Sequence, residues 1–129
     1  MAATIVSPDA SIYGRVTKMS VPSVAQELEE LLGAKLVAYI AGVTEARAVR
    51  KWGRGEREPR PVVLDRLRTA LRVALMIAET DGPGVAQAWF QGLNPQLDDR
   101  SPARLLREGD VGQVGPEVLG AARSFVAGV

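Results

Sequence analysis

Four basic residues with helical spacing are the first feature of this chain that points to chemistry. They fall at positions i, i+3, i+4 and i+7 of one segment: Arg47, Arg50, Lys51 and Arg54. A helix there would carry them as one stripe, with Val49 and Trp52 roughly 160° away on an apolar face. Such a stripe suits a nucleic acid, because neutralising phosphates releases counterions. A solvated helix face is the plainer interpretation.

The stripe follows a second short helix across a glycine-containing turn. Residues 35–41 predict an apolar helix that Gly42 ends, and Thr44 is a natural N-cap for the basic helix that follows. That is the layout of a helix-turn-helix, whose second helix enters the major groove of DNA. The residues expected at the DNA are Thr44, Arg47, Arg50, Lys51, Arg54, Arg57 and Arg60. The last three belong with the loop after the helix and are expected on phosphates rather than on base edges.

The formal net charge of +1 hides an uneven distribution. Residues 47–72 hold nine basic and three acidic side chains and therefore carry +6, which leaves −5 for the remainder of the chain. The C-terminal half mixes acidic and basic residues, a pattern that favours a protein partner over a polyanion.

The residue types that are missing exclude several kinds of catalytic site. The sequence has no cysteine and no histidine, so disulfides, thiolate chemistry and a Ser-His-Asp arrangement are excluded. The adjacent Asp98 and Asp99 lack a second element that would place a carboxyl of raised pKa opposite them. Gly53 and Gly55 match neither the dinucleotide fingerprint nor the Walker spacing. We therefore expect no enzyme, no metal site, no cofactor and no small-molecule substrate.

The sequence also argues against a membrane location. No run approaches the ~20 apolar residues of a membrane span, and the first residues lack the basic and apolar parts of a signal peptide. The absence of cysteine is consistent with a reducing compartment. We expect a soluble, cytoplasmic protein.

The hydrophobic periodicity predicts an all-α fold of about seven helices. Residues 1–19 show no helical period and are expected as an extended or mobile arm, with a possible short strand at residues 4–6. Residues 20–80 would hold the helix-turn-helix region, beginning with an amphipathic helix whose N-cap is Ser20 or Ser23. Residues 81–129 would form a C-terminal part with short helices, of which the last begins at Gly115 and Pro116.

The long helix expected at residues 61–78 has two apolar faces. Leu67 and Leu71 belong to one face, and Val73 and Ile77 belong to the other. A helix of this kind is normally buried on both faces. We expect it to join the helix-turn-helix to the C-terminal part as a spine, or to contribute to a homodimer contact.

The aromatic residues follow the apolar periods. Trp52 is expected in the core. Trp89 and Phe90 are also expected there, with a partner-facing aromatic residue as the alternative. In the turn-rich loop that follows, Leu93 and Leu97 are expected to anchor the chain to the core.

Two stretches taken together resemble one family. Residues 36–59 resemble the Xre-type helix-turn-helix of the Xre/MbcA/ParS antitoxins, and residues 88–110 with the last helix resemble the toxin-binding domain of the same group. The second match consists of a tryptophan, an Asn-x-x-Leu loop and a proline-containing short helix: Trp89, Asn94, Leu97, Pro102, Leu105 and Leu106. The resemblance covers roughly residues 21–129, and its specificity lies in having both halves in order.

The resemblance implies an antitoxin that is paired with a RES-domain toxin, an enzyme that consumes NAD. The C-terminal domain would cover the entrance to the toxin's active site, and the pair would repress its own promoter. The residues implied at the toxin are Trp89, Asn94, Asp98, Arg100, Arg104, Arg107, Arg123 and Val129. Because the chain ends directly after the last helix, we expect the helix end or the loop at residues 98–107 to do the blocking.

The sequence therefore predicts an antitoxin and transcriptional repressor that works as a homodimer within a larger toxin–antitoxin assembly, since palindromic half-sites need two recognition helices. An orphan regulator whose C-terminal helices only dimerise is the first alternative. An adaptor that has lost DNA binding is the second.

Overall fold

The computed structural model describes residues 8–128, which form eight α-helices, one short 3₁₀-helix and no strand. The elements are α1 Pro8–Lys18, α2 Val21–Leu32, α3 Ala34–Ala41, α4 Ala46–Gly53, α5 Pro61–Asp81, α6 Pro83–Gln91, η1 Pro95–Leu97, α7 Pro102–Glu108 and α8 Val111–Ala127. The all-α prediction is confirmed, and α1 is the helix that the sequence interpretation did not include.

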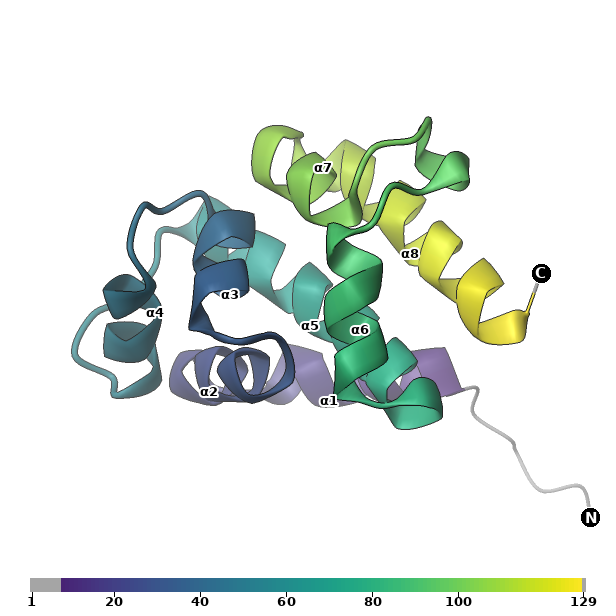
Figure 1. Ribbon diagram of the computed structural model, residues 1–129. Coiled ribbons are helices and arrows are strands. Elements are labelled where there is room, and N and C mark those ends of the chain that lie inside the picture. Colours follow the sequence, from purple (N-terminus) through teal and green to yellow (C-terminus); the bar gives the residue numbers. More distant parts are fainter. Residues whose placement is uncertain (1–7, 129) are drawn as a thin grey trace, which may run out of the picture.

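Helix α5 runs through the middle of the molecule (Figure 1). Helices α1, α2, α3, α6 and α8 all pack against it. Its residues Leu67, Leu71, Val73 and Ile77 are at most 1% exposed. Both apolar faces of α5 are thus covered by helices of the same chain, so the spine interpretation accounts for them without a second copy.

The prediction of an extended N-terminal arm is wrong for the part of it that the structure describes. Residues 8–18 form helix α1, which packs on α5 and buries Ile12 and Val16 to 1% exposure. A single i, i+4 apolar pair in an otherwise polar segment gives little periodic signal, and here the contact with α5 supplies the stabilisation instead. The possible strand at residues 4–6 lies outside the described residues.

The ends of α1, α2, α3 and α4 share one feature. In each, a side chain from another helix donates a hydrogen bond to a carbonyl oxygen near the C-terminus, where the helix supplies few N–H donors of its own. The bonds run from Arg68 to Val16 at 2.6 Å, Gln87 to Leu31 at 3.0 Å, Arg66 to Ala41 at 2.8 Å, Arg107 to Tyr39 at 2.7 Å, and Gln26 to Gly53 at 2.5 Å. Three of the donors are arginines, whose charge also suits the negative end of a helix dipole. Part of the basic content of the sequence therefore holds helices together.

The helix starts agree with the sequence only in part. Ser20 and Ser101 are N-caps whose hydroxyls accept from Ser23 N and Arg104 N, respectively, as predicted. Thr44 is not an N-cap, because α4 begins one residue later than expected, with Glu45 in the cap position and no side-chain bond. Helix α8 begins at Val111 instead of Gly115, because the Asp110 carboxylate accepts from Gly112 N and starts the helix one turn earlier.

Candidate nucleic-acid interface and C-terminal loop

Helices α3 and α4 form a helix-turn-helix at one end of the molecule (Figure 1). Gly42 ends α3 with φ of 84°, a left-handed conformation that glycine adopts without strain, and its N–H bonds to the carbonyls of Ala38 and Tyr39. Val43 in the turn is partly buried against the core, as predicted. The turn therefore fixes the angle at which α4 leaves the core.

The apolar face of α4 is buried against α2 and α3. Val49 is fully buried and Trp52 is 3% exposed, which confirms Trp52 as a core residue. Its indole Nε1 has no hydrogen-bond acceptor among the described residues. With this face inward, the basic stripe of α4 is directed away from the core.

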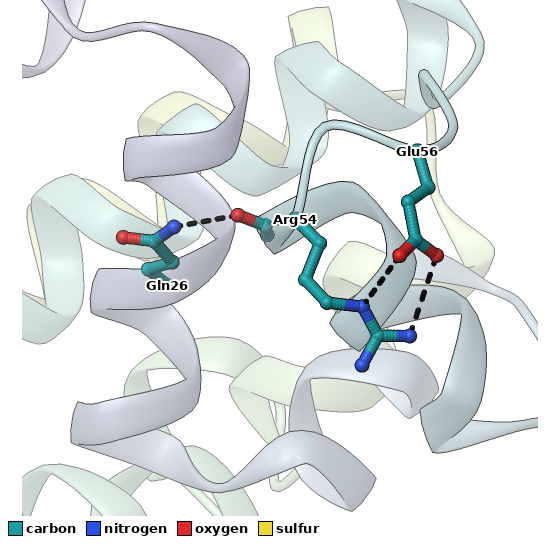
Figure 2. A network of polar contacts seen from close by, with 4 residues as sticks. Gln26, Arg54 and Glu56 are labelled. Carbon is teal, nitrogen blue, oxygen red and sulfur yellow. Dashed lines mark hydrogen bonds and ion pairs between the residues drawn. The ribbon is translucent and has the colours of Figure 1, made fainter.

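A glycine lets the end of α4 approach α2 closely. Gly53 is buried, and a Cβ at this position would stand 3.3 Å from Gln26 Cγ. Figure 2 shows Gln26 reaching from α2 to bond the carbonyl at the end of α4. The register between the two helices, and with it the orientation of the stripe, is fixed by this contact.

The seven residues expected at the DNA have different surroundings. Thr44, Arg47, Arg57 and Arg60 are exposed, and Lys51 is half-buried. Arg50 Nε lies 3.6 Å from a Glu29 carboxylate oxygen, and Arg54 Nε lies 3.0 Å from one of Glu56 (Figure 2). Because such exposed ion pairs contribute little, a phosphate can replace the carboxylate at modest cost.

Part of the predicted set comes together in one hollow. This α4 hollow has a volume of about 470 Å³ and is lined by Gly42, Val43, Thr44, Glu45, Arg47, Ala48, Lys51 and Arg57. Three cations face one carboxylate there, so the hollow is net positive. Arg50, Arg54 and Arg60 do not line it. A cationic hollow beside a helix N-terminus can hold a phosphate of a nucleic-acid backbone.

Two arginines crowd together at the other side of the turn. Arg66 and Arg107 each donate to a carbonyl near the end of α3, and the Arg107 guanidinium also lies 4.7 Å from the centre of the Tyr39 ring. Burial, and then the charge of Arg107, lower the pKa of Arg66 below its usual value. Arg107 therefore contacts the helix-turn-helix, although it belongs to α7.

The loop at residues 92–101 is tightly hydrogen-bonded. The Asn94 carbonyl accepts from Leu97 N and Asp99 N, both at 2.9 Å, and its side chain accepts from Gln96 N. Asn94 N bonds the Arg100 carbonyl at 3.2 Å. Leu97 anchors the loop as predicted, at 3% exposure, whereas the same prediction for Leu93 is wrong, because Leu93 is 76% exposed. The loop is thus held in one conformation, and the side chain of Leu93 is exposed on its surface.

Two aspartates of this loop have unusual backbone conformations. Asp98 and Asp99 have φ of 56° and 59°, a left-handed region that aspartate tolerates better than most residues. The Asp98 side chain is 94% exposed and lies 3.7 Å from Arg100. The left-handed pair turns the chain back toward α7 and leaves the Asp98 carboxylate at the surface.

The residues implied at a toxin do not share one surface. Asn94, Asp98 and Arg100 lie in the loop, and Asn94 serves mainly to close it. The partly buried Trp89 contacts Phe90 and Phe125, with ring centres 5.5 Å and 6.3 Å away. Phe90 is fully buried, as predicted.

The arginines of that set lie elsewhere. Arg104 is exposed, and its hydrogen bond to Glu108 raises its pKa above the usual value. Arg107 binds Tyr39 of α3, and Arg123 binds Asp9 of α1 at 2.6 Å. Val129 lies outside the described residues.

Sequence reasoning missed three residues that shape these surfaces. The sequence predicts that Leu93 anchors to the core and places Phe125 on the apolar side of the last helix, but Phe125 is 41% exposed, and Lys35 receives no role. The apolar period of α8 places Phe125 on the same side as the buried Val118 and Ala122. No sequence signal distinguishes it from them.

A metal cluster and a membrane-spanning helix are not found in the described part of the chain. Within residues 8–128, no three acidic, histidine or cysteine side chains gather where they could hold a metal ion. No described helix combines the length and apolar character that crossing a membrane requires.

Comparison with known proteins gives one informative result. No protein-family model and no curated protein matches the chain. Among solved structures, it is similar to a chain of the crystal structure of the M. tuberculosis MbcT–MbcA toxin–antitoxin complex, with a TM-score of 0.68 and 27% sequence identity over 86% of this chain and 97% of that chain. This similarity confirms the resemblance to MbcA-type antitoxins.

Proposed function

We propose that this chain, which shares its fold and motifs with MbcA-type antitoxins, is the antitoxin of a toxin–antitoxin pair. The observation that carries the proposal is that one continuous fold, similar to a chain of a toxin–antitoxin complex, holds both the outward-facing basic helix and the exposed C-terminal loop. The partner would be a RES-domain toxin that consumes NAD, neutralised by covering its active-site entrance.

The loop at residues 92–101 and the neighbouring end of α8 are the proposed contact with the toxin. Hydrogen bonds within the loop hold it in one conformation before the toxin binds, which lowers the conformational entropy lost on association. Leu93 and Phe125 expose apolar surface there, and Trp89 supports the Phe125 ring. Apolar and aromatic anchors of this kind dominate many protein interfaces.

The helix-turn-helix is the proposed contact with operator DNA. The cations of α4 lie outward, and the α4 hollow gathers two of them, Arg47 and Lys51, with Arg57 of the following loop beside the start of the helix. Two copies of the chain would place two α4 helices on the half-sites of a palindrome, so we propose a homodimer within the toxin–antitoxin assembly. Binding there would repress the operon that encodes the pair.

Co-expression tests the antitoxin proposal. The product of the adjacent reading frame is expressed with and without this chain, and cell growth and cellular NAD are measured in both cases. We expect the intact chain to restore both and to co-purify with a RES-domain protein, and a form truncated after Gly109 to fail because α8 is missing. Failure of the intact chain to bind or neutralise that protein would overturn the proposal.

A further inference from the structure

A second cationic hollow lies beside the helix-turn-helix, and one of its basic residues comes from the C-terminal half. This α3 hollow has a volume of about 520 Å³ and is lined by Lys35, Ala38, Tyr39, Val43, Thr44, Ala46 and Arg107. No described aspartate or glutamate lines it. Its two charged side chains, Lys35 of α3 and Arg107 of α7, are both positive.

The two hollows flank the start of α4. Val43 and Thr44 line both of them, so the turn that leads into α4 forms the wall between them. An element that enters the major groove has a phosphodiester backbone on each side. Cations on both sides of the recognition helix match that arrangement. The α4 hollow would contact the backbone of one DNA strand, and the α3 hollow would contact the backbone of the other.

The cations of the α3 hollow lack compensating charge. Seven of the sixteen basic residues have a carboxylate within ion-pairing distance: Arg15, Arg50, Arg54, Arg72, Arg100, Arg104 and Arg123. Among the described residues, no such partner is found for Lys35 or Arg107, and Arg107 instead lies near the like charge of Arg66. An anion in the hollow would relieve this repulsion.

The Arg107 guanidinium is held in place while most of its donors remain available. Its Nη1 donates to the Tyr39 carbonyl at 2.7 Å, and its Cζ lies 4.7 Å from the centre of the Tyr39 ring. A guanidinium carries five N–H donors, so a phosphate can bind without displacing these contacts. Positioning by α3 keeps the charge at the edge of the turn.

We propose that Lys35 and Arg107 form a second backbone-phosphate site, so that the C-terminal half takes part directly in DNA binding. This rests on the proposed DNA-binding function of the helix-turn-helix. Arg107 then belongs to the DNA-facing surface instead of the toxin-facing surface to which the sequence resemblance assigned it.

Salt-dependent binding of the full-length protein to its own promoter fragment tests the site. Each phosphate contact contributes about −0.9 to the slope of log Kobs against log salt concentration. We expect Arg107→Gln to weaken binding evenly across operator and unrelated sequences and to make the slope shallower by about 0.9. Lys35→Gln should act in the same direction, and Arg107→Lys, which keeps the charge, should retain most of the wild-type slope.

The matched control is Arg15→Gln on α1, a helix that lies apart from α4 (Figure 1), and it removes the same charge from an ion pair with Glu79. It should leave the slope unchanged. A wild-type slope for Arg107→Gln, or an equal loss for Arg107→Gln and Arg107→Lys, would overturn the proposal.

The variant Arg47→Ala distinguishes failure of the second phosphate site from failure of the proposed DNA-binding function. If Arg47→Ala weakens binding and Arg107→Gln does not, the second site is wrong and the DNA-binding function stands. If neither the wild type nor any variant binds the promoter, both are wrong. If Arg107→Gln weakens only the complex with the toxin, the hollow accepts an acidic side chain of the partner, and the phosphate site is wrong.

Discussion

Asp9 and Arg123, which are 114 residues apart in sequence, are joined by a 2.6 Å hydrogen bond from Arg123 Nε to Asp9 Oδ2. The other oxygen of Asp9 lies 3.7 Å from Arg72 Nη2. One carboxylate thus links α1, α5 and α8, and the side chains of Asp9 and Arg72 are only 25% and 19% exposed. Arg123, which the resemblance placed at a toxin, here ties the last helix to the first.

Replacing Asp9 by alanine should destabilise the fold. The change leaves the largely buried charge of Arg72 without its carboxylate, so we expect the free energy of unfolding to fall by about 1–3 kcal/mol. The matched variant is Glu79→Gln, whose partner Arg15 is 52% exposed, and its effect should stay within about 1 kcal/mol. Urea denaturation of both variants measures the difference, and equal effects would show that Asp9 is only a surface charge.

Helix α1 should contribute to stability, contrary to the extended arm that the sequence predicts. Ile12→Ala removes a fully packed side chain between α1 and α5, and we expect a loss of about 2–5 kcal/mol in unfolding free energy. Ser11→Ala, at an exposed position of the same helix, should change it by less than about 0.5 kcal/mol. A wild-type melting curve for Ile12→Ala would mean that α1 is detached in solution.

The sequence predicts most of the helices because their apolar periods are long enough to identify a buried face. Residues 61–78 predict a helix buried on two sides, and α5 is buried on two sides. Helix α1 is missed because Ile12 and Val16 alone do not make a period, and its stabilisation comes from α5, which lies about 60 residues further along the chain.

The candidate site is predictable to a smaller extent. Spacing alone directs the stripe of α4 outward, since Val49 and Trp52 must face the core. The partners of individual arginines depend on distant elements, however. Nothing near Arg107 in sequence indicates that it meets Tyr39, and nothing near Arg123 indicates Asp9.

Two glycines with opposite surroundings give opposite predictions. A Cβ at Gly109, between α7 and α8, would lie 2.8 Å from the Leu105 carbonyl oxygen and 2.5 Å from Val114 Cγ1, so Gly109→Ala should destabilise by about 1–3 kcal/mol. A Cβ at Gly14 inside α1 meets nothing within 4 Å, so Gly14→Ala should stabilise by about 0.5–1 kcal/mol. Thermal unfolding of the two variants provides the comparison. A rise in melting temperature for Gly109→Ala would show that the α7–α8 corner adapts to the added methyl group.

Leu93 provides the sharpest test of the proposed toxin-facing surface. Its side chain is 76% exposed on a loop that Leu97 and the Asn94 bonds hold in place, so Leu93→Ser should leave the unfolding free energy within about 0.5 kcal/mol of wild type. If Leu93 is an anchor for the toxin, the same change should weaken the complex by about 1–3 kcal/mol, roughly five- to 150-fold in Kd. Val62→Ser removes an exposed apolar side chain of similar size at the start of α5 and should leave toxin affinity unchanged. Titration calorimetry with the purified toxin measures both, and equal affinities for the two variants would place the contact elsewhere.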